Sequence, residues 1–372
     1  MPVSAECTST EVRPSAIIYC EGNFGAIDGK TANGLVRHSE RYEILAVVDS
    51  QLAGQDAGLV LDGVDRGIPI CRDLHDAMTQ AGAGPDLCIV GMAPTSGLLS
   101  NEERSVLLQA MSHGLGIVNG LHEFLNDDPE FAATAAINNV EILDIRRPRA
   151  KTELRMFSGR ILDVTCPRLA VLGTDGAIGK RTTATVLTRA LREIGINAVL
   201  VGTGQTSIIQ GARHAVALDA VPAQFVTGEL EAVVVEAFET DDPDIIIVEG
   251  QGALSHPTYL SSTAVLRGSR PSAVILQHAP TRRTISDYPA FAMPTPASEI
   301  NLIETFADTK VIGLTLNHEN MTDAEITAAI TLYEVELGIP CTDAIARPAG
   351  HLVDMVLAHF PELQQRTAIT TT

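Results

Sequence analysis

The chain alternates between short apolar runs of strand character and longer stretches in which apolar residues recur at helical spacing. Polar loops containing glycine separate the two kinds of segment. The apolar runs include SAIIYC (15–20), YEILAVVDS (42–50), PDLCIVGMAP (85–94), LGIVNG (115–120), RLAVLG (168–173), NAVLVG (197–202), DIIIVEG (244–250) and PSAVILQHAP (271–280). Strands and helices that alternate in this order predict two doubly wound, mostly parallel sheets, so the expected fold class is α/β.

The apolar pattern weakens between residues 141 and 168, where Arg and Pro cluster. We place a domain boundary there, near residue 150, because 372 residues is long for one core and two domains of ordinary size are expected. The chain then divides into a flexible leader (1–15), a first α/β domain (16–150) and a second α/β domain (151–372). The basic run Arg146, Arg147, Arg149 and Lys151 is interpreted as a solvated linker, with a contact to bound phosphate as the alternative.

The stretch RLAVLGTDGAIGKRTT (168–183) runs an apolar strand into a glycine-rich loop that ends in Gly179-Lys180. Glycines lack a Cβ, so the backbone can turn sharply and direct its N–H groups at an anion, and Lys180 adds a positive charge. The following residues have helical spacing, and a helix N-terminus favours negative charge. We therefore predict a phosphate-binding loop with ligand contacts from Gly173, Thr174, Gly176, Gly179, Lys180, Arg181, Thr182 and Thr183. The alternative is a glycine-rich turn that binds nothing.

The loop departs from the common phosphate-binding motif GxxxxGK[ST]. Thr174 stands where the first glycine is expected, and Arg181 replaces the hydroxyl residue that normally follows the lysine and binds Mg²⁺. Thr182 offers a hydroxyl one position late. The longer form GTDxxxGK, which begins at Gly173, resembles the dethiobiotin synthetase branch of the P-loop proteins. The second domain is accordingly expected to be P-loop NTPase-like.

Two later strands of the second domain also lead into small or polar residues. GTGQTS (202–207) follows one strand, and VEGQGALSHP (248–257) ends another with Glu249. Since ligands meet the carboxyl ends of strands in an open α/β sheet, both should lie beside the phosphate-binding loop. Gly204, Gln205 and Thr206 are predicted to contribute to cofactor binding there. Asp219, further along the chain, is interpreted as the N-cap of a helix.

The first domain carries its own glycine-rich loop, EGNFGAIDGKT (21–31), after its first strand. The glycine spacing is not GxGxxG, so it supports a nicotinamide-binding fingerprint only weakly. Asp49 ends the next strand, where it could bind a ribose or form a turn. The order of elements loosely resembles the CoA-binding domain of acyl-CoA ligases, so a Rossmann-like domain is expected here.

Composition narrows the function further. A net charge of −20 argues against nucleic acid as a partner, because such binding depends on clustered Lys and Arg. The six cysteines form no CxxC pair, and Cys20 and Cys88 are expected to be buried apolar residues, so neither a zinc site nor a disulfide framework is predicted. No apolar run approaches the roughly 20 residues that span a bilayer, and no secretory signal is evident, so we expect a cytoplasmic protein without a membrane partner.

Four motifs together resemble one bacterial and archaeal family whose named activity is D-glutamate N-acetyltransferase. They are GNFGAIDGKTANGL with VVDS in the first domain, and GTDGAIGKRTT, GTGQTS with ALDAV, and VEGQGALSHP in the second. The resemblance extends from Ala16 to about Phe360. It implies a Rossmann-like domain joined to a P-loop domain. It also implies transfer of an acetyl group from acetyl-CoA to the amine of D-glutamate, or of a similar acidic amino acid, in amino-acid catabolism.

Under this resemblance each predicted site residue takes a role. The phosphate-binding loop would hold the phosphates of CoA without splitting ATP. Glu249, His256 and Asp175 are the candidates for the base that deprotonates the substrate ammonium. Backbone N–H groups at 250–252 or at Gln205-Thr206 could stabilise the thioester oxyanion. The substrate would contact Gln251, Ser255, Arg282 and Arg283, with Arg213 as a further candidate for its carboxylates.

Two other functions stay open on the sequence alone. The first is an ATP-dependent ligase or kinase like dethiobiotin synthetase, in which Lys180 and Thr182 hold phosphates and Glu249 supports Mg²⁺. The second is a nucleotide-binding protein without catalytic activity. Only the first requires ATP and Mg²⁺; acetyl-CoA is otherwise the expected cosubstrate, and no metal site is predicted. We expect a homo-oligomer that acts on small molecules.

Overall fold

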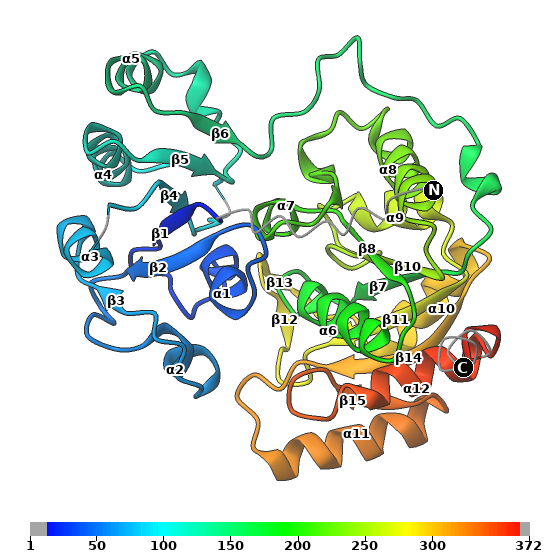
Figure 1. Cartoon of the computed structure of the whole chain (residues 1–372). Coiled ribbons are helices and arrows are strands. Elements are labelled where there is room, and N and C mark those ends of the chain that lie inside the picture. Colours follow the sequence, from blue (N-terminus) through cyan, green and yellow to red (C-terminus); the bar gives the residue numbers. More distant parts are fainter. Residues whose placement is uncertain (1–12, 83, 95, 365–372) are drawn as a thin grey trace, which may run out of the picture. The chain divides into compact units, whose positions relative to one another are not determined.

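The computed structural model describes residues 13–82, 84–94 and 96–364, which form two compact units (Figure 1). The boundary between the units falls between Ile145 and Arg146, and Ile209–Gly211 belongs to the first unit. Of the predicted flexible leader, residues 1–12 lie outside the described ranges, and Ser15 already begins the first strand. Both units are α/β, which confirms the fold class predicted from the apolar pattern.

The first unit is built on a six-stranded sheet in the order β3-β2-β1-β4-β5-β6, and all its strand pairs are parallel. Its strands are β1 (Ser15–Tyr19), β2 (Glu43–Val48), β3 (Ile70–Cys71), β4 (Leu87–Val90), β5 (Gly116–Asn119) and β6 (Ile142–Asp144). Its helices are α1 (Lys30–Arg37), α2 (Ala57–Asp62), α3 (Leu74–Ala81), α4 (Asn101–Ser112) and α5 (Pro129–Asn138), with a 3₁₀ turn η1 (Leu125–Asp127). This strand order is that of Rossmann folds, in which the order reverses beside β1.

Side chains fix the ends of several helices in the first unit. Ser100 and Glu103 form a capping box at the start of α4. Gln210, which belongs to this unit, donates from Nε2 to the carbonyls of Gly34 (2.8 Å) and His38 (2.9 Å) at the end of α1. The end of α1 is therefore held by a residue that comes much later in the chain.

The second unit contains a seven-stranded sheet in the order β15-β14-β11-β7-β10-β8-β9, again with every pair parallel. Its strands are β7 (Arg168–Gly173), β8 (Ala198–Gly202), β9 (His214–Ala215), β10 (Ile245–Glu249), β11 (Ala273–His278), β14 (Lys310–Leu316) and β15 (Cys341–Asp343). A separate antiparallel hairpin after β11 consists of β12 (Thr284–Ile285) and β13 (Tyr288–Ala292). The helices are α6 (Lys180–Glu193), α7 (Gln205–Gln210), α8 (Val226–Asp241), α9 (Ser261–Ser269), α10 (Pro296–Phe306), α11 (Asp323–Leu337) and α12 (Gly350–His359), with 3₁₀ turns η2 (Arg160–Asp163) and η3 (Leu218–Ala220).

Strand β7 lies at the centre of this second sheet and is buried on both faces. Leu169 and Val171 point to one face, where they join an apolar cluster with residues of α6 and α12. Ala170 and Leu172 alternate with them and join the opposite cluster, which includes residues of α8, α9 and α10. Because helices cover both faces, the strand reads as a continuous apolar run, and only its carboxyl end is open to polar residues.

Two predictions from composition concern cysteines and membrane spans. Cys20 and Cys88 are both fully buried, as predicted from their apolar surroundings. Burial raises the pKa of the Cys88 thiol to about 12, so this group stays protonated. Among the helices in the described ranges, none is long and apolar enough to cross a bilayer.

Candidate functional site

Loops that follow neighbouring strands of the second sheet are hydrogen-bonded to one another at its carboxyl edge. The N–H of Thr174, after β7, donates to the carbonyl of Gln277 in β11 (3.0 Å). The N–H of Thr203, after β8, donates to the carboxylate of Glu249 at the end of β10 (3.0 Å). The structure therefore brings together the strand ends that carry the motifs GTDGAIGKRTT, GTGQTS and VEGQGALSHP.

The loop between β7 and α6 has the backbone of an anion site. The N–H of Gly176 donates to the Asp175 side chain (2.7 Å). Within the described part of the chain, the next N–H groups, those of Ala177, Ile178 and Gly179, have no hydrogen-bond partner. They lie directly before the N-terminus of a fourteen-residue helix, where the helix dipole favours negative charge.

Two glycines and one lysine shape this loop. A Cβ on Gly173 would lie 2.9 Å from Ile178 Cδ1 and 3.1 Å from the carbonyl oxygen of Gln277, so a larger residue would force both to shift. Gly179 has φ +102°, a conformation that residues with a Cβ rarely adopt. Lys180 is buried and folds back so that its Nζ donates to the carbonyl of Asp175. The positive charge is thereby held at the loop and is not displayed at the surface.

Arg282, predicted to bind substrate carboxylates, instead holds the phosphate-binding loop. Its Nη1 donates to Asp175 (3.1 Å) and to the carbonyl of Gly176 (3.0 Å), and its Nη2 donates to the carbonyl of Ala177 (3.1 Å). Nε and Nη2 also form a fork on Glu319 (2.6 and 2.9 Å). An arginine has five N–H donors, and these bonds occupy all of them. The structure therefore leaves Arg282 no donor for a substrate carboxylate.

Asp175, one of the predicted bases, is fully buried and tied into the same network. Its Oδ1 accepts the N–H of Gly176, and its Oδ2 accepts both Arg282 and the N–H of Ser286 (3.1 Å). With both oxygens bound and the side chain fully buried, the carboxylate has no open face toward a substrate. We therefore assign Asp175 a structural role, which corrects its place among the candidate bases.

Glu249 keeps the position that its sequence motif predicts. It ends β10, is 7% exposed, and accepts hydrogen bonds at Oε2 from the N–H of Thr203 and from the hydroxyl of Ser207. Among the described residues, no side chain or backbone group bonds to its Oε1. A Cβ on the next residue, Gly250, would lie 2.2 Å from the carbonyl oxygen of Val171, so the chain can leave β10 in this way only at glycine. Glu249 thus offers one free carboxylate oxygen at the site.

His256 lies in an aromatic pocket in the loop between β10 and α9. Its ring stacks on Tyr259 (4.3 Å between ring centroids) and meets the edge of Tyr288 (5.8 Å). Nδ1 accepts the N–H groups of Thr258 (3.2 Å) and Tyr259 (3.3 Å), whereas Nε2 is buried and has no partner among the described residues. Burial lowers the pKa of His256, and the positive charge of Lys180 lowers it further. The negative charges of Asp175 and Asp287 act in the opposite direction but do not outweigh the burial. The neutral form of the ring is therefore favoured.

Comparison with known proteins identifies the two halves of the chain. Residues 50–148 match a family model described as "Domain of unknown function (DUF1611_N) Rossmann-like domain", and residues 155–353 match "Domain of unknown function (DUF1611_C) P-loop domain". The chain belongs to the DUF1611 family. A crystal structure of a DUF1611 family protein from Anabaena variabilis ATCC 29413 is 31% identical, with a TM-score of 0.85 over 93% of this chain and 100% of that one.

Two relatives of this DUF1611 protein carry the name D-glutamate N-acetyltransferase. The one from Tritonibacter scottomollicae is 31% identical over 282 residues, which is 74% of this chain and 82% of the relative. The one from Pseudoalteromonas sp. is 29% identical over 283 residues, with the same coverage of both chains. The family resemblance seen in the sequence is confirmed, and the names of these relatives support an N-acetyltransferase role.

In this DUF1611 protein, two predicted substrate contacts hold the loop after β10. Ser255 donates from Oγ to Glu299 (2.6 Å), a carboxylate that is almost fully buried. Gln251 donates from its side-chain amide to the carbonyl of Thr203. A Cβ on Gly204 would lie 3.3 Å from that amide nitrogen, so glycine at this position leaves room for the side chain of Gln251. Neither position requires a substrate to explain it.

The remaining predicted contacts lie at different depths in the second unit. Thr183 is buried and donates to Gln277 (2.6 Å), whereas Arg181, Thr182 and Thr206 are half-buried. Arg283 is exposed on the chain that leads into the hairpin β12–β13. Arg213 is 71% exposed and pairs with Asp241 (2.6 Å). In the part of the chain that the structure describes, no hydrogen bond or ion pair connects Arg213 with the phosphate-binding loop.

Arg146 and Asp219 correct two interpretations of the sequence. Arg146 is 6% exposed, so it is not part of a solvated linker. Its guanidinium donates to Asp219 (2.7 and 3.1 Å) and to Gln205 (2.9 Å), so it positions a predicted cofactor contact. Asp219 lies in η3, and the N-cap of α8 is Phe225, so Asp219 does not cap that helix. The partners of Arg146 are too distant in sequence for a local pattern to reveal them.

The strand-end acid of the first unit, Asp49, is a turn residue. It is almost fully buried, and its two carboxylate oxygens accept the N–H groups of Phe24 (3.0 Å) and Gln51 (3.0 Å). Both oxygens therefore hold the backbone of this DUF1611 protein. Of the two sequence interpretations, the structure supports the turn and not the ribose contact.

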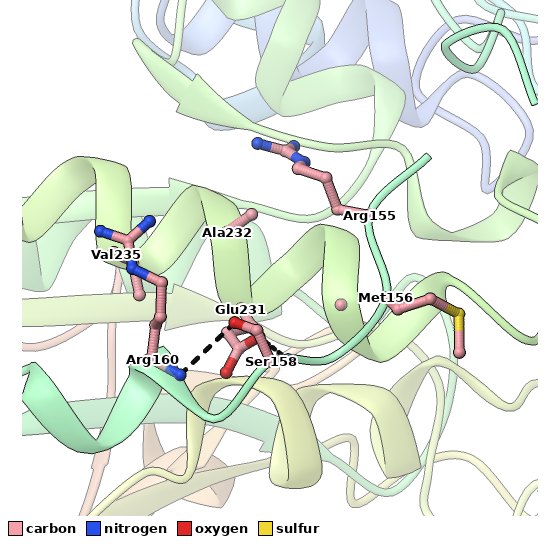
Figure 2. A pocket seen from close by; sticks show the side chains of 8 residues that line it. Arg155, Met156, Ser158, Arg160, Glu231, Ala232 and Val235 are labelled. Atoms are coloured by element: carbon pink, nitrogen blue, oxygen red, sulfur yellow. Dashed lines mark hydrogen bonds between the residues drawn. The ribbon is translucent and has the colours of Figure 1, made fainter. Parts of the chain in front are cut away.

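A separate cavity of about 310 Å³ in the second unit contains none of the predicted site residues. It lies between residues 155–160 and α8 (Figure 2) and is lined by Arg155, Met156, Ser158, Arg160, Gly228, Glu231, Ala232 and Val235. Glu231 is bound by the N–H (2.6 Å) and hydroxyl (2.9 Å) of Ser158, and Arg155 pairs with Glu229. Arg160 pairs with Glu239, so each charged side chain that lines this cavity already has a partner in the second unit. The candidate site stays at the carboxyl edge of the sheet.

Proposed function

We propose that this protein is an N-acetyltransferase that moves the acetyl group of acetyl-CoA to the amine of D-glutamate, or of a similar acidic amino acid, in amino-acid catabolism. The observation that carries the proposal is the row of open N–H groups from Ala177 to Gly179 beside the buried Lys180, in a family with relatives named for this reaction. Coenzyme A carries phosphate groups, and such a loop is suited to hold them.

The loop fits a ligand whose phosphates are bound but not cleaved. Phosphoryl transfer in P-loop enzymes uses a hydroxyl directly after the lysine to bind Mg²⁺. Here Arg181 holds that position, and Thr182 is half-buried one residue later. Lys180 and the loop N–H groups can still bind a phosphate without that hydroxyl. The departures from the common motif therefore favour binding of CoA over cleavage of ATP.

The reaction needs a base, and Glu249 fits this role best. The substrate ammonium must lose a proton before its nitrogen forms a bond to the acetyl carbon. The carbon–sulfur bond of the thioester then breaks, and the CoA thiolate leaves and takes up the second proton, which the attacking nitrogen loses as it becomes an amide. The free Oε1 of Glu249 can accept the ammonium proton, while Oε2 is held by Thr203 and Ser207. Asp175, whose oxygens are all engaged, cannot serve in the same way.

One experiment tests this proposal against phosphoryl transfer. The protein is incubated with acetyl-CoA or with ATP and Mg²⁺, each in the presence of D-glutamate or L-glutamate, and the release of free thiol and of ADP is followed. We expect thiol release with acetyl-CoA and D-glutamate. Release of ADP would overturn the proposal in favour of a ligase or kinase. Release of neither product, with saturable binding of acetyl-CoA, would overturn catalysis and indicate a binding protein.

A further inference from the structure

The hydrogen bonds at His256 determine which ring nitrogen carries the proton. A backbone amide nitrogen only donates, so the N–H groups of Thr258 and Tyr259 require a lone pair on Nδ1. A neutral imidazole has one N–H group, which must then be on Nε2. A nitrogen that already carries hydrogen cannot take up a proton. In this arrangement His256 donates from Nε2 and does not act there as a base.

The surroundings hold the ring in this state. Tyr259 stacks on one face of the ring and donates its hydroxyl to Asp287 (2.5 Å), and burial and this carboxylate raise the pKa of the phenol. Tyr288 meets the ring from the hairpin and accepts the hydroxyl of Thr258 (2.7 Å). The charged groups that act on His256 are Asp175, Asp287 and Lys180. The orientation of the ring is thus set from the loop after β10 and from the hairpin β12–β13.

The Nε2–H group of His256 makes no hydrogen bond within the described part of the chain. It is also fully buried. Leaving a buried donor unpaired costs about 1–3 kcal/mol, so a donor kept in this state is expected to serve a ligand. Tyr259, which stacks on the ring, donates to Asp287, and the N–H of the neighbouring Ser286 donates to Asp175 in the phosphate-binding loop (3.1 Å). His256 therefore lies at the same end of the sheet as that loop.

We propose, on the basis of the acetyl transfer proposed above, that His256 donates from Nε2–H to the acetyl carbonyl oxygen as that oxygen becomes negative. Preorganised donors at such an oxygen stabilise the transition state without any reorganisation. Glu249 takes the ammonium proton, and His256 stabilises the charge that forms when nitrogen attacks carbon. The site then separates the two tasks, and no proton passes through the imidazole.

The proton position can be measured without any activity. The intact protein is labelled with ¹⁵N-histidine, and long-range ¹H–¹⁵N spectra are recorded near pH 7, with His256→Asn used to assign the ring. We expect a protonated Nε2 and an unprotonated Nδ1. A proton on Nδ1, or on both nitrogens, would overturn the inference. This result stands even if the protein transfers no acetyl group, so it separates failure of the inference from failure of the proposed function.

A pair of variants tests the catalytic role. His256→Gln keeps an N–H donor but cannot act as a base, whereas His256→Ala removes the donor. We expect kcat to fall about 10-fold or less in the glutamine variant and about 10²–10³-fold in the alanine variant, because one oxyanion donor has that effect. The Kd of acetyl-CoA should stay within about 3-fold of wild type in both. Equal losses of kcat in two variants that melt at the wild-type temperature would identify a base and overturn the role of donor. A Kd effect larger than the kcat effect would place the bond on a ground-state group and overturn the assignment to the acetyl oxygen.

Discussion

Each unit of this protein has a glycine-rich loop between its first strand and a helix that begins with lysine, yet the two loops differ in where their N–H groups go. In the loop of the first unit, the side chains of Asp49 and Asn33 accept the N–H groups of Phe24 and Gly25 (3.0 Å each). Its own carbonyls accept the N–H groups of Ala26, Gly29 and Lys30, so most of the N–H groups from Asn23 to Lys30 are bound within the described chain. In the loop after β7, the N–H groups of residues 177–179 bond to nothing in the described chain. Glycines followed by lysine are therefore not enough to predict an anion site.

The two loops are also held in different ways. The first is held from inside by Asp49, at the end of the adjacent strand, which accepts backbone N–H groups on both of its carboxylate oxygens. The second is held from outside, by Arg282 on its carbonyls and by Gln277 on the N–H of Thr174. Support on the carbonyl side leaves the N–H side available for a ligand. The corresponding strand-end acid, Glu249, is likewise held through one oxygen only.

The largest expected contrast is between the two strand-end acids. Replacing Glu249 with Gln keeps the shape and removes the proposed base, so kcat should fall about 10²–10⁴-fold with stability nearly unchanged. Asp49→Asn should leave kcat within about 3-fold and lower the free energy of unfolding by about 1–3 kcal/mol, because a buried N–H loses its acceptor. Steady-state kinetics and urea unfolding of both variants measure this. Full turnover by the Glu249 variant would exclude it as the base.

The next contrast is between the two lysines that begin a helix. Lys180→Ala should raise the Kd of acetyl-CoA about 10- to 100-fold, since hydrogen bonds to charged groups contribute about 1.5–3 kcal/mol. The effect on kcat at saturating acetyl-CoA should be much smaller, because the role proposed for this lysine is to bind the ligand and not to take part in the chemistry. Lys30 is exposed at the start of α1, and Lys30→Ala should leave the Kd unchanged. Isothermal titration calorimetry measures the Kd of acetyl-CoA for both variants. Equal losses of affinity in the two variants would refute the distinction between the loops.

The smallest contrast is between two glycines with positive φ. Gly25 (φ +79°) and Gly179 (φ +102°) both have room for a Cβ, with nearest atoms at 3.6 and 3.7 Å, so alanine would add only backbone strain. Each substitution should lower the free energy of unfolding by about 1–2 kcal/mol. Only Gly179→Ala should also weaken acetyl-CoA binding, because it displaces an N–H of the open loop. Chemical unfolding and calorimetry distinguish the two effects, and a matching loss of affinity in Gly25→Ala would contradict the assignment.

The sequence was sufficient for the fold and for the meeting of three motifs at one edge of the second sheet, because both depend on local patterns. Apolar runs predicted the parallel strands, and the motifs after three of those strands predicted their meeting at one edge. The sequence could not show which charged side chains are already paired within the protein. Arg282 finds Glu319 at a separation of 37 residues, and Arg146 finds Asp219 at 73, so no local spacing reveals either pair.

The residues around His256 were missed for a related reason. Tyr259 lies three residues from His256 and could have been noticed in the motif. Asp287 and Tyr288 come from a hairpin in which β12 has only two residues and β13 contains a proline, so the segment gives no regular strand signal. The direction of the histidine ring depends on backbone N–H groups of the loop itself. Such bonds follow from the path of the backbone, which residue types alone do not specify.

The membership of Ile209–Gly211 in the first unit has a practical consequence for dissecting the protein. A gene fragment that stops at residue 145 would encode every strand of the first sheet but not Ile209, which is fully buried, or Gln210, whose side chain holds the end of α1. The backbone carbonyl of Gln210 also accepts the N–H of Glu40 (2.9 Å). No single cut in the chain therefore yields the first unit intact. Experiments that ask what this unit does on its own should silence the other half by point substitutions such as Lys180→Ala, and keep the polypeptide whole.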